Sequence, residues 1–211
     1  MTPAEYTKQV TLLLSELLVD TGFYKKRIGR LMRNTKECEQ DIILSFIRGR
    51  GLPITSYPVN LNLSFTFKEM NRLASKFLGK EYDAKSHTGM QPLYATIPGK
   101  SISRIDYRSD EPLNQYAERV ADDFRSYALP YFEKYDTLEK LEVYFDQYLV
   151  QKIGEHGFHI ANGLGPKGVS NCYFAAILCL LGKWEKLYML LKSIDWFPDQ
   201  KERIIEYISN Q

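Results

Sequence analysis

The chain has 211 residues, 44% of them hydrophobic and 26% charged, and its 28 lysines and arginines exceed its 26 acidic residues by a net charge of +2. This composition is typical of a folded globular protein and excludes the disordered and fibrous classes. The length is sufficient for one large domain or two small ones with a hydrophobic core.

The first predicted element is an amphipathic helix over residues 6–19. Its apolar residues are spaced three and four apart, at Val10, Leu13, Leu14, Leu17 and Leu18. Gly22 follows as a stop signal.

Neither targeting nor membrane insertion is predicted from the sequence. The longest apolar runs are less than half of the roughly 20 residues that cross a bilayer. Glu5 precedes the first apolar stretch, and no basic region or small-residue cleavage site accompanies it, as a secretory signal requires. We therefore expect a cytoplasmic protein that does not enter a membrane.

Residues 57–67 show the clearest strand pattern, because apolar and polar side chains alternate throughout. The pattern predicts that Leu61, Leu63 and Phe65 are buried and that Asn60, Asn62 and Ser64 face solvent or a shallow groove. Further strands are predicted over residues 27–35, 42–47 and 101–108. Together these segments favour an antiparallel meander.

Helices follow the strands. The apolar spacing predicts them over residues 113–132, 138–153, 169–181, 184–194 and 198–209, with Pro130 expected to kink the first or start a new turn. The predicted order, with one helix followed by strands and then by helices, indicates an α+β fold. We expect an antiparallel sheet of about four strands packed by the N-terminal and central helices, with a helical C-terminal part. We expect an α+β domain over residues 1–134 and a helical extension over 135–211, packed together as one unit.

Several short motifs in the first 150 residues resemble a known family. They are GFYKK at 22–26, Arg33, IILSF at 42–46, VNLNL at 59–63 and YALPYFEK at 127–134. In these the chain is similar to the bacterial domain-of-unknown-function family numbered 4304. The resemblance implies a bacterial cytoplasmic protein of α+β fold without assigned catalytic residues. Some proteins of that general kind accompany toxins as immunity proteins, and this analogy is at the level of the fold.

The sequence contains isolated residues of catalytic types without a recognisable catalytic pattern. The glycines of residues 163–168 match a phosphate-binding spacing, but the flanking strands of a dinucleotide fold are missing from the pattern. His156 and His159 lie among glycines, and His87 lies in a polar loop. Cys38, Cys172 and Cys179 have no metal-ligand spacing and are predicted to be buried, reduced thiols. We predict no catalytic residue, no cofactor and no metal site.

Charge is strongly segregated along the chain. Residues 21–108 carry a net charge of +9 and residues 110–146 a net charge of −6. The acidic block coincides with the predicted helix over 113–132, where Glu118, Asp122 and Asp123 lie on its polar side. These three residues are the predicted contact with another protein, which we expect to be basic, such as a toxin domain. The first functional hypothesis is therefore a non-enzymatic protein-binding module of the immunity type.

The basic block supports an alternative function. No acidic residue lies between Asp20 and Glu37, and the cationic residues available to nucleic acid are Lys25, Lys26, Arg27, Arg30, Arg33, Arg48 and Arg50. Lysines and arginines on neighbouring strands would contact phosphates, and Phe23 and Tyr24 would stack on bases. This hypothesis is a nucleic-acid-associated protein that uses residues 25–50.

Overall fold

The computed structural model describes residues 2–46, 59–99, 112–151, 167–193 and 196–211. The chain forms two compact units. The first contains Met1–Phe65 and Met90–Lys134, and the second contains Thr66–Gly89 and Tyr135–Gln211. The division into an α+β domain over residues 1–134 and a helical extension over 135–211, packed together as one unit, stays a prediction.

The first helix, α1 (Pro3–Leu17), begins with a capping box. The backbone N–H of Thr2 donates to the carboxylate of Glu5 at 2.7 Å, and the Glu5 N–H donates to the Thr2 hydroxyl at 3.3 Å. These bonds satisfy donors that the first turn of a helix leaves unpaired. Val10, Leu14 and Leu18 are fully buried, which confirms the predicted apolar face.

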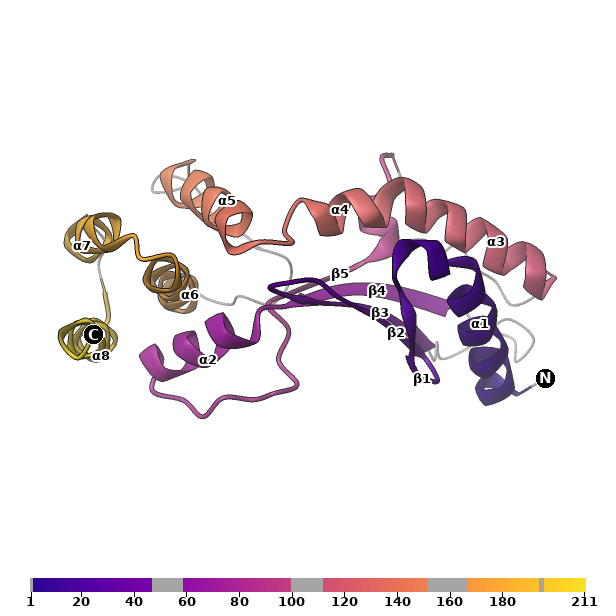
Figure 1. The fold of residues 1–211 in the computed structure, drawn as a ribbon, viewed down its shortest axis with the longest axis horizontal. Helices are drawn as coiled ribbons and strands as arrows, with labels where there is room; N and C mark the ends of the chain where they lie inside the picture. The colour runs from indigo at the N-terminus through magenta and orange to yellow at the C-terminus, as the bar shows by residue number, and fades with distance from the viewer. Residues whose placement is uncertain (1, 47–58, 100–111, 152–166, 194–195) are drawn as a thin grey trace, which may run out of the picture. The chain divides into compact units, whose positions relative to one another are not determined.

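The sheet has five strands in the order of the sequence (Figure 1). They are β1 (Tyr24–Arg27), β2 (Arg30–Asn34), β3 (Glu39–Phe46), β4 (Val59–Thr66) and β5 (Gly89–Pro92). The α+β class is confirmed, with one strand more than the four or so predicted from the sequence. The strand predicted over 101–108 lies outside the described residues.

The strand predicted over residues 27–35 is wrong in its extent. This region is a hairpin, in which β1 and β2 pair antiparallel around a turn at Ile28 and Gly29. Gly29 has φ of +78°, a conformation that a residue with a side chain rarely adopts. The glycine is therefore what turns the chain.

The centre of the sheet is buried on both faces. Leu31 and Ile42, which pair across β2 and β3, are buried, and so are the adjacent pair Met32 and Asp41, which point to the opposite face. Strand β4 shows the same pattern: Leu61, Leu63 and Phe65 are buried as predicted, and Ser64 is also fully buried. The prediction that Ser64 faces solvent or a groove is therefore wrong, because an alternating sequence does not require one face to be open.

A helical segment packs against the apolar side of this sheet. It comprises α3 (Leu113–Asp123), the π-helix η3 (Phe124–Ala128) and α4 (Leu129–Glu133). The ring of Phe23 lies 5.1 Å from that of Phe124 and 5.7 Å from that of Phe132, and Phe65 of β4 lies 6.2 Å from Tyr131. Aromatic contacts at these distances stabilise beyond the area that they bury.

The second unit is helical. It contains α2 (Lys68–Phe77), α5 (Leu138–Gln151), α6 (Lys167–Leu180), α7 (Trp184–Ser193) and α8 (Pro198–Ser209). The rings of Phe145 and Phe174 stack at 5.8 Å between α5 and α6, and Phe77 contacts Tyr207 at 5.5 Å between α2 and α8. None of the helices in the described ranges is long and apolar enough to span a bilayer.

A buried carboxylate links two helices of this unit. Glu142 of α5 accepts hydrogen bonds from Lys186 at 2.6 Å and from Lys183 at 3.0 Å. Burial alone would raise the pKa of Glu142, but the two ammonium groups outweigh it, so the pKa lies below its usual value. The ionised carboxylate therefore stabilises the packing of α5 with the loop and helix that carry the lysines.

Truncating the strand core tests the register of β4. We expect Leu63→Ala to lower the free energy of unfolding by about 2–5 kcal/mol, because the fully buried side chain leaves a cavity. The control, Asn62→Ala, removes a half-buried side chain that donates to Ser45 at 3.2 Å, and should cost at most about 1.5 kcal/mol. Chemical denaturation measures both, and equal losses would contradict this register.

The acid dependence of stability tests the Glu142 contacts. Because the folded-state pKa of Glu142 is lowered, its contribution is present above the unfolded-state pKa and is lost as pH falls through the folded-state value. The variant Glu142→Gln should therefore be less stable than the native chain at neutral pH, and the difference should shrink in acid. Urea denaturation over a pH series measures it, and a difference independent of pH would contradict the ionic contribution.

Candidate protein-interaction surface

The helical segment over the sheet changes its hydrogen-bonding pattern in η3. The N–H of Leu129 donates to the carbonyl of Phe124, five residues earlier, instead of the usual four. Pro130 follows and has no N–H, so the carbonyl of Ser126 loses its α-helical donor, and the proline ring would collide with that carbonyl in a regular helix. The π-turn accommodates the proline without ending the helical segment.

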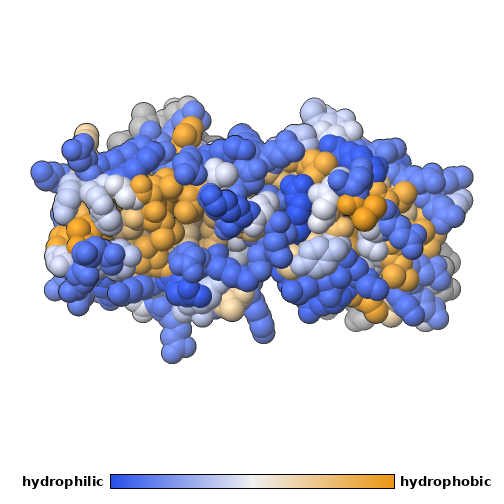
Figure 2. All heavy atoms as spheres, in the orientation of Figure 1, coloured by the Kyte–Doolittle hydropathy of each residue, from blue (hydrophilic) through white to orange (hydrophobic). Residues whose placement is uncertain are grey.

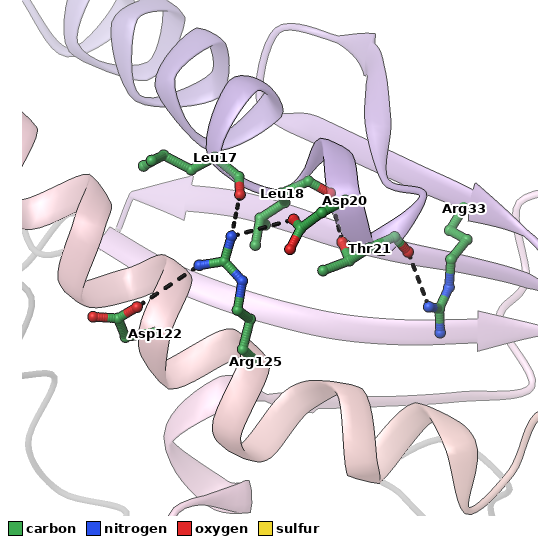
Figure 3. Close-up of polar contacts among 7 residues, drawn as sticks. All are labelled: Leu17, Leu18, Asp20, Thr21, Arg33, Asp122 and Arg125. Atoms are coloured by element: carbon green, nitrogen blue, oxygen red, sulfur yellow. Dashed lines mark hydrogen bonds and ion pairs between the residues drawn. The ribbon is translucent and has the colours of Figure 1, made fainter.

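The π-helix carries Arg125 to the C-terminal end of α1 (Figure 3). The guanidinium donates to the carbonyl of Leu17 and to Asp20 at 3.2 Å, and lies 3.7 Å from Asp122. The carbonyls at the end of a helix lack intrahelical donors and carry partial negative charge. Arg125 therefore caps α1 and holds one carboxylate from each of two elements.

A second arginine approaches the same turn from the sheet. The short helix η1 (Val19–Thr21) follows α1, and the guanidinium of Arg33 donates to the carbonyl of Thr21 at 3.0 Å (Figure 3). Arg33 also donates to Gln40 at 2.8 Å and lies over the ring of Phe23 at 5.0 Å. These contacts stabilise the turn within the chain.

Exposed acidic side chains lie on both sides of Arg125 and one turn further along α3. Glu118 and Asp122 lie one turn apart on the exposed side of α3, and Asp20 of η1 is exposed on the other side of Arg125. Asp20, Glu118 and Asp122 are referred to below as the acidic surface. Asp123, the third acidic residue predicted from the sequence, is half-buried and has a contact of its own.

The predicted basic residues divide into two groups. Lys25, Lys26 and Arg27 are exposed on β1. By contrast, Arg30 makes a bidentate ion pair with the fully buried Asp41, at 2.6 and 2.7 Å, and this hydrogen bonding raises the pKa of Arg30. Arg33 is engaged with Thr21 and Gln40, as described above. Arg48 and Arg50 lie outside the described residues.

The cysteines and His87 are residue types that can act in catalysis, and the structure describes the environment of each. Burial raises the pKa of Cys172 and of Cys179 to about 12, which keeps both thiols protonated at neutral pH, and Cys38 is also buried. His87 lies 3.1 Å from the Thr66 hydroxyl. No three His, Cys, Asp or Glu residues in the described ranges are placed to hold a metal ion. His156, His159 and the glycines of 163–168 fall outside the described side chains.

Exposed apolar residues are found in the second unit. The exposed large hydrophobic residues of α6 and α7 are Leu180, Trp184, Tyr188 and Met189. Figure 2 shows hydrophobic residues gathered on the visible face of the second unit. Patches of this kind often bind other molecules. No charge pattern accompanies this one to indicate the chemistry of a partner, so the functional proposal rests on the first unit.

Comparison with family models, with curated proteins and with solved structures found no match for the chain. The resemblance to the family numbered 4304 stays a prediction. The function is therefore argued from the geometry of the side chains alone.

Removing Arg125 tests its role at the end of α1. We expect Arg125→Gln to lower the free energy of unfolding by about 1–2 kcal/mol. The substitution leaves the Leu17 carbonyl without its charged donor and removes the cation that pairs with Asp20 and Asp122. The control is Glu69→Gln, which breaks an exposed pair with Arg72 and should cost less than about 0.5 kcal/mol. Thermal and urea denaturation compare the two, and equal effects would argue against the cap.

Proposed function

We propose that the chain is a non-enzymatic protein-binding module whose acidic surface docks a basic partner. The observation that carries the proposal is the pairing of the exposed Asp20 and Asp122 with Arg125, with Glu118 exposed one turn before Asp122 on α3. With the neighbouring Asp123 and Arg119 included, four carboxylates against two guanidinium groups leave a local excess of negative charge. Such an excess attracts a basic protein and orients it during encounter.

The anchoring of this surface supports a binding role. Arg125 joins η1 to α3, and the rings of Phe124 and Phe132 beneath it pack on Phe23. Carboxylates that are already held in place lose little conformational freedom when a partner binds. A partner with matching lysines or arginines therefore meets a surface that is already arranged.

The proposed partner is a toxin domain, which makes the chain an immunity-type inhibitor. A toxin that acts on nucleic acid needs a basic surface, and an inhibitor that covers this surface needs carboxylates in a fixed arrangement. The buried thiols of Cys172 and Cys179, with pKa values of about 12, are unsuited to nucleophilic catalysis, which favours a binding role over thiol chemistry.

Nucleic-acid binding through residues 25–50 has less support. Of the five predicted cations that the structure describes, Arg30 and Arg33 are engaged within the chain. Three exposed cations on β1 remain for phosphates. Fewer phosphate contacts mean weaker binding with a shallower dependence on salt.

The proposal is tested by reversing the charge of the acidic surface. The native chain is used to capture its partner from cells of its own source, and the affinity for the purified partner is measured by calorimetry. Glu118→Lys with Asp122→Lys should weaken binding at least about tenfold, since both carboxylates face the partner. Asp122→Lys with Asp123→Lys should weaken binding less, because Asp123 is half-buried.

The matched control is Glu69→Lys with Glu185→Lys, which reverses two exposed carboxylates of the second unit. It should change the affinity less than about twofold. Equal losses in control and test variants would show that only net charge matters, and an unchanged affinity in the test variant would remove the acidic surface from the interaction. Capture of nucleic acid in place of a protein would favour the alternative function.

A further inference from the structure

Strand β1 forms one edge of the sheet, and among the described strands it pairs with β2 alone (Figure 1). All four of its residues, Tyr24–Arg27, are exposed, and Ile28 in the following turn is 57% exposed. An edge strand presents backbone N–H and C=O groups on its outer side that the sheet does not pair. Within the described ranges, no strand covers this edge, so its backbone groups are available to another extended segment.

The side chains of this edge carry three positive charges that no described residue of the unit neutralises. Lys25, Lys26 and Arg27 make no ion pair with a described residue. Two carboxylates of the same unit are engaged with other cations: Asp41 binds Arg30, and Asp20 binds Arg125. The edge therefore combines unpaired backbone groups with an excess of positive charge.

These charges determine which strand could pair with the edge. Two copies of β1 placed side by side would bring like charges together, which disfavours pairing between copies of this chain. An acidic strand, in contrast, would place carboxylates opposite the lysines and the arginine. Opposite charges across a strand pair stabilise it.

The geometry favours a polypeptide over a nucleic acid at this edge. Only a polypeptide can add a ladder of backbone hydrogen bonds. In addition, the hydroxyl of Tyr24 accepts a hydrogen bond from Asn34 at 3.4 Å, which ties the ring to the sheet instead of leaving it to stack on a base.

We propose that β1 is a second docking site, at which an acidic extended segment of a partner protein adds as a further strand of the sheet. The register of β1 on β2 shifts between Lys25 and Arg27, so Lys26 is the extra residue of a bulge. The bulge limits the added ladder to a short segment. This site shares no residue with the acidic surface, so its test does not depend on the function proposed above.

The test uses the full chain and a labelled short peptide of alternating glutamate and valine, with binding followed by fluorescence anisotropy at low salt. A second peptide has the same sequence but N-methyl groups on alternate amides, which removes the donors that a ladder needs. A labelled oligothymidylate is the third probe. The unmodified peptide should bind at least about tenfold more tightly than the methylated one.

Reversing charges on β1 tests whether its side chains contribute to peptide binding. Lys25→Glu with Arg27→Glu should weaken binding of the unmodified peptide at least about tenfold, whereas Lys8→Glu with Lys36→Glu, which changes the net charge equally at other exposed positions, should change it less than about twofold. If the glutamate variant does not fold by circular dichroism, Lys25→Ala with Arg27→Ala replaces it.

Four results would overturn the proposal. Equal binding of both peptides would show attraction by charge without strand addition. Tighter binding of the oligothymidylate, lost in the edge variant, would assign the edge to nucleic acid. No binding of the unmodified peptide, or equal losses in edge and control variants, would remove β1 as a docking site.

Discussion

The arrangement of the first unit depends on one missing hydrogen-bond donor, the N–H that Pro130 lacks. The segment before it takes a π-turn, in which Leu129 donates to Phe124, and continues as a helix. This geometry brings Arg125 to the carbonyl of Leu17 while Phe124 faces the core. The proline and the arginine, five residues apart, thus join the sheet's covering helix to the end of α1. The acidic surface lies on this junction.

Buried charges in this unit stabilise the fold, whereas exposed charges mainly affect the approach of a partner. Asp41 is fully buried, and removing its partner Arg30 would leave an isolated charge in the protein interior, which costs about 3–5 kcal/mol. Arg33 similarly satisfies the carbonyl of Thr21. The charges of Lys25 and Glu118 face water, where their effect on stability is small and their effect on a partner's approach is large.

The elements with strong periodicity could be predicted from the sequence. The apolar positions of α1, the buried set of β4 and α8 (Pro198–Ser209) follow from local spacing alone. Helix α2 was missed, although Met70, Leu73, Ala74 and Phe77 have helical spacing and are buried. The hairpin was missed because its turn, Ile28–Gly29, lacks the Asn-Gly or Asp-Gly pair that usually marks one. Ser64 shows a different limit, since alternation predicts two faces but does not indicate what covers the second.

The candidate surfaces were predictable only in part, because a charge count does not distinguish a buried ion pair from an exposed side chain. Residues 21–108 carry a net charge of +9, but Arg30 is neutralised by an acid eleven residues away, on the neighbouring strand. Asp20 was not predicted as part of the acidic surface, because its proximity to Asp122 arises from Arg125, more than 100 residues further along the chain. Sequence spacing locates charges that share one helix, such as Glu118 and Asp122. A surface assembled from two elements depends instead on the contacts that bring those elements together, and here those contacts are the arginine cap and the aromatic rings beneath it.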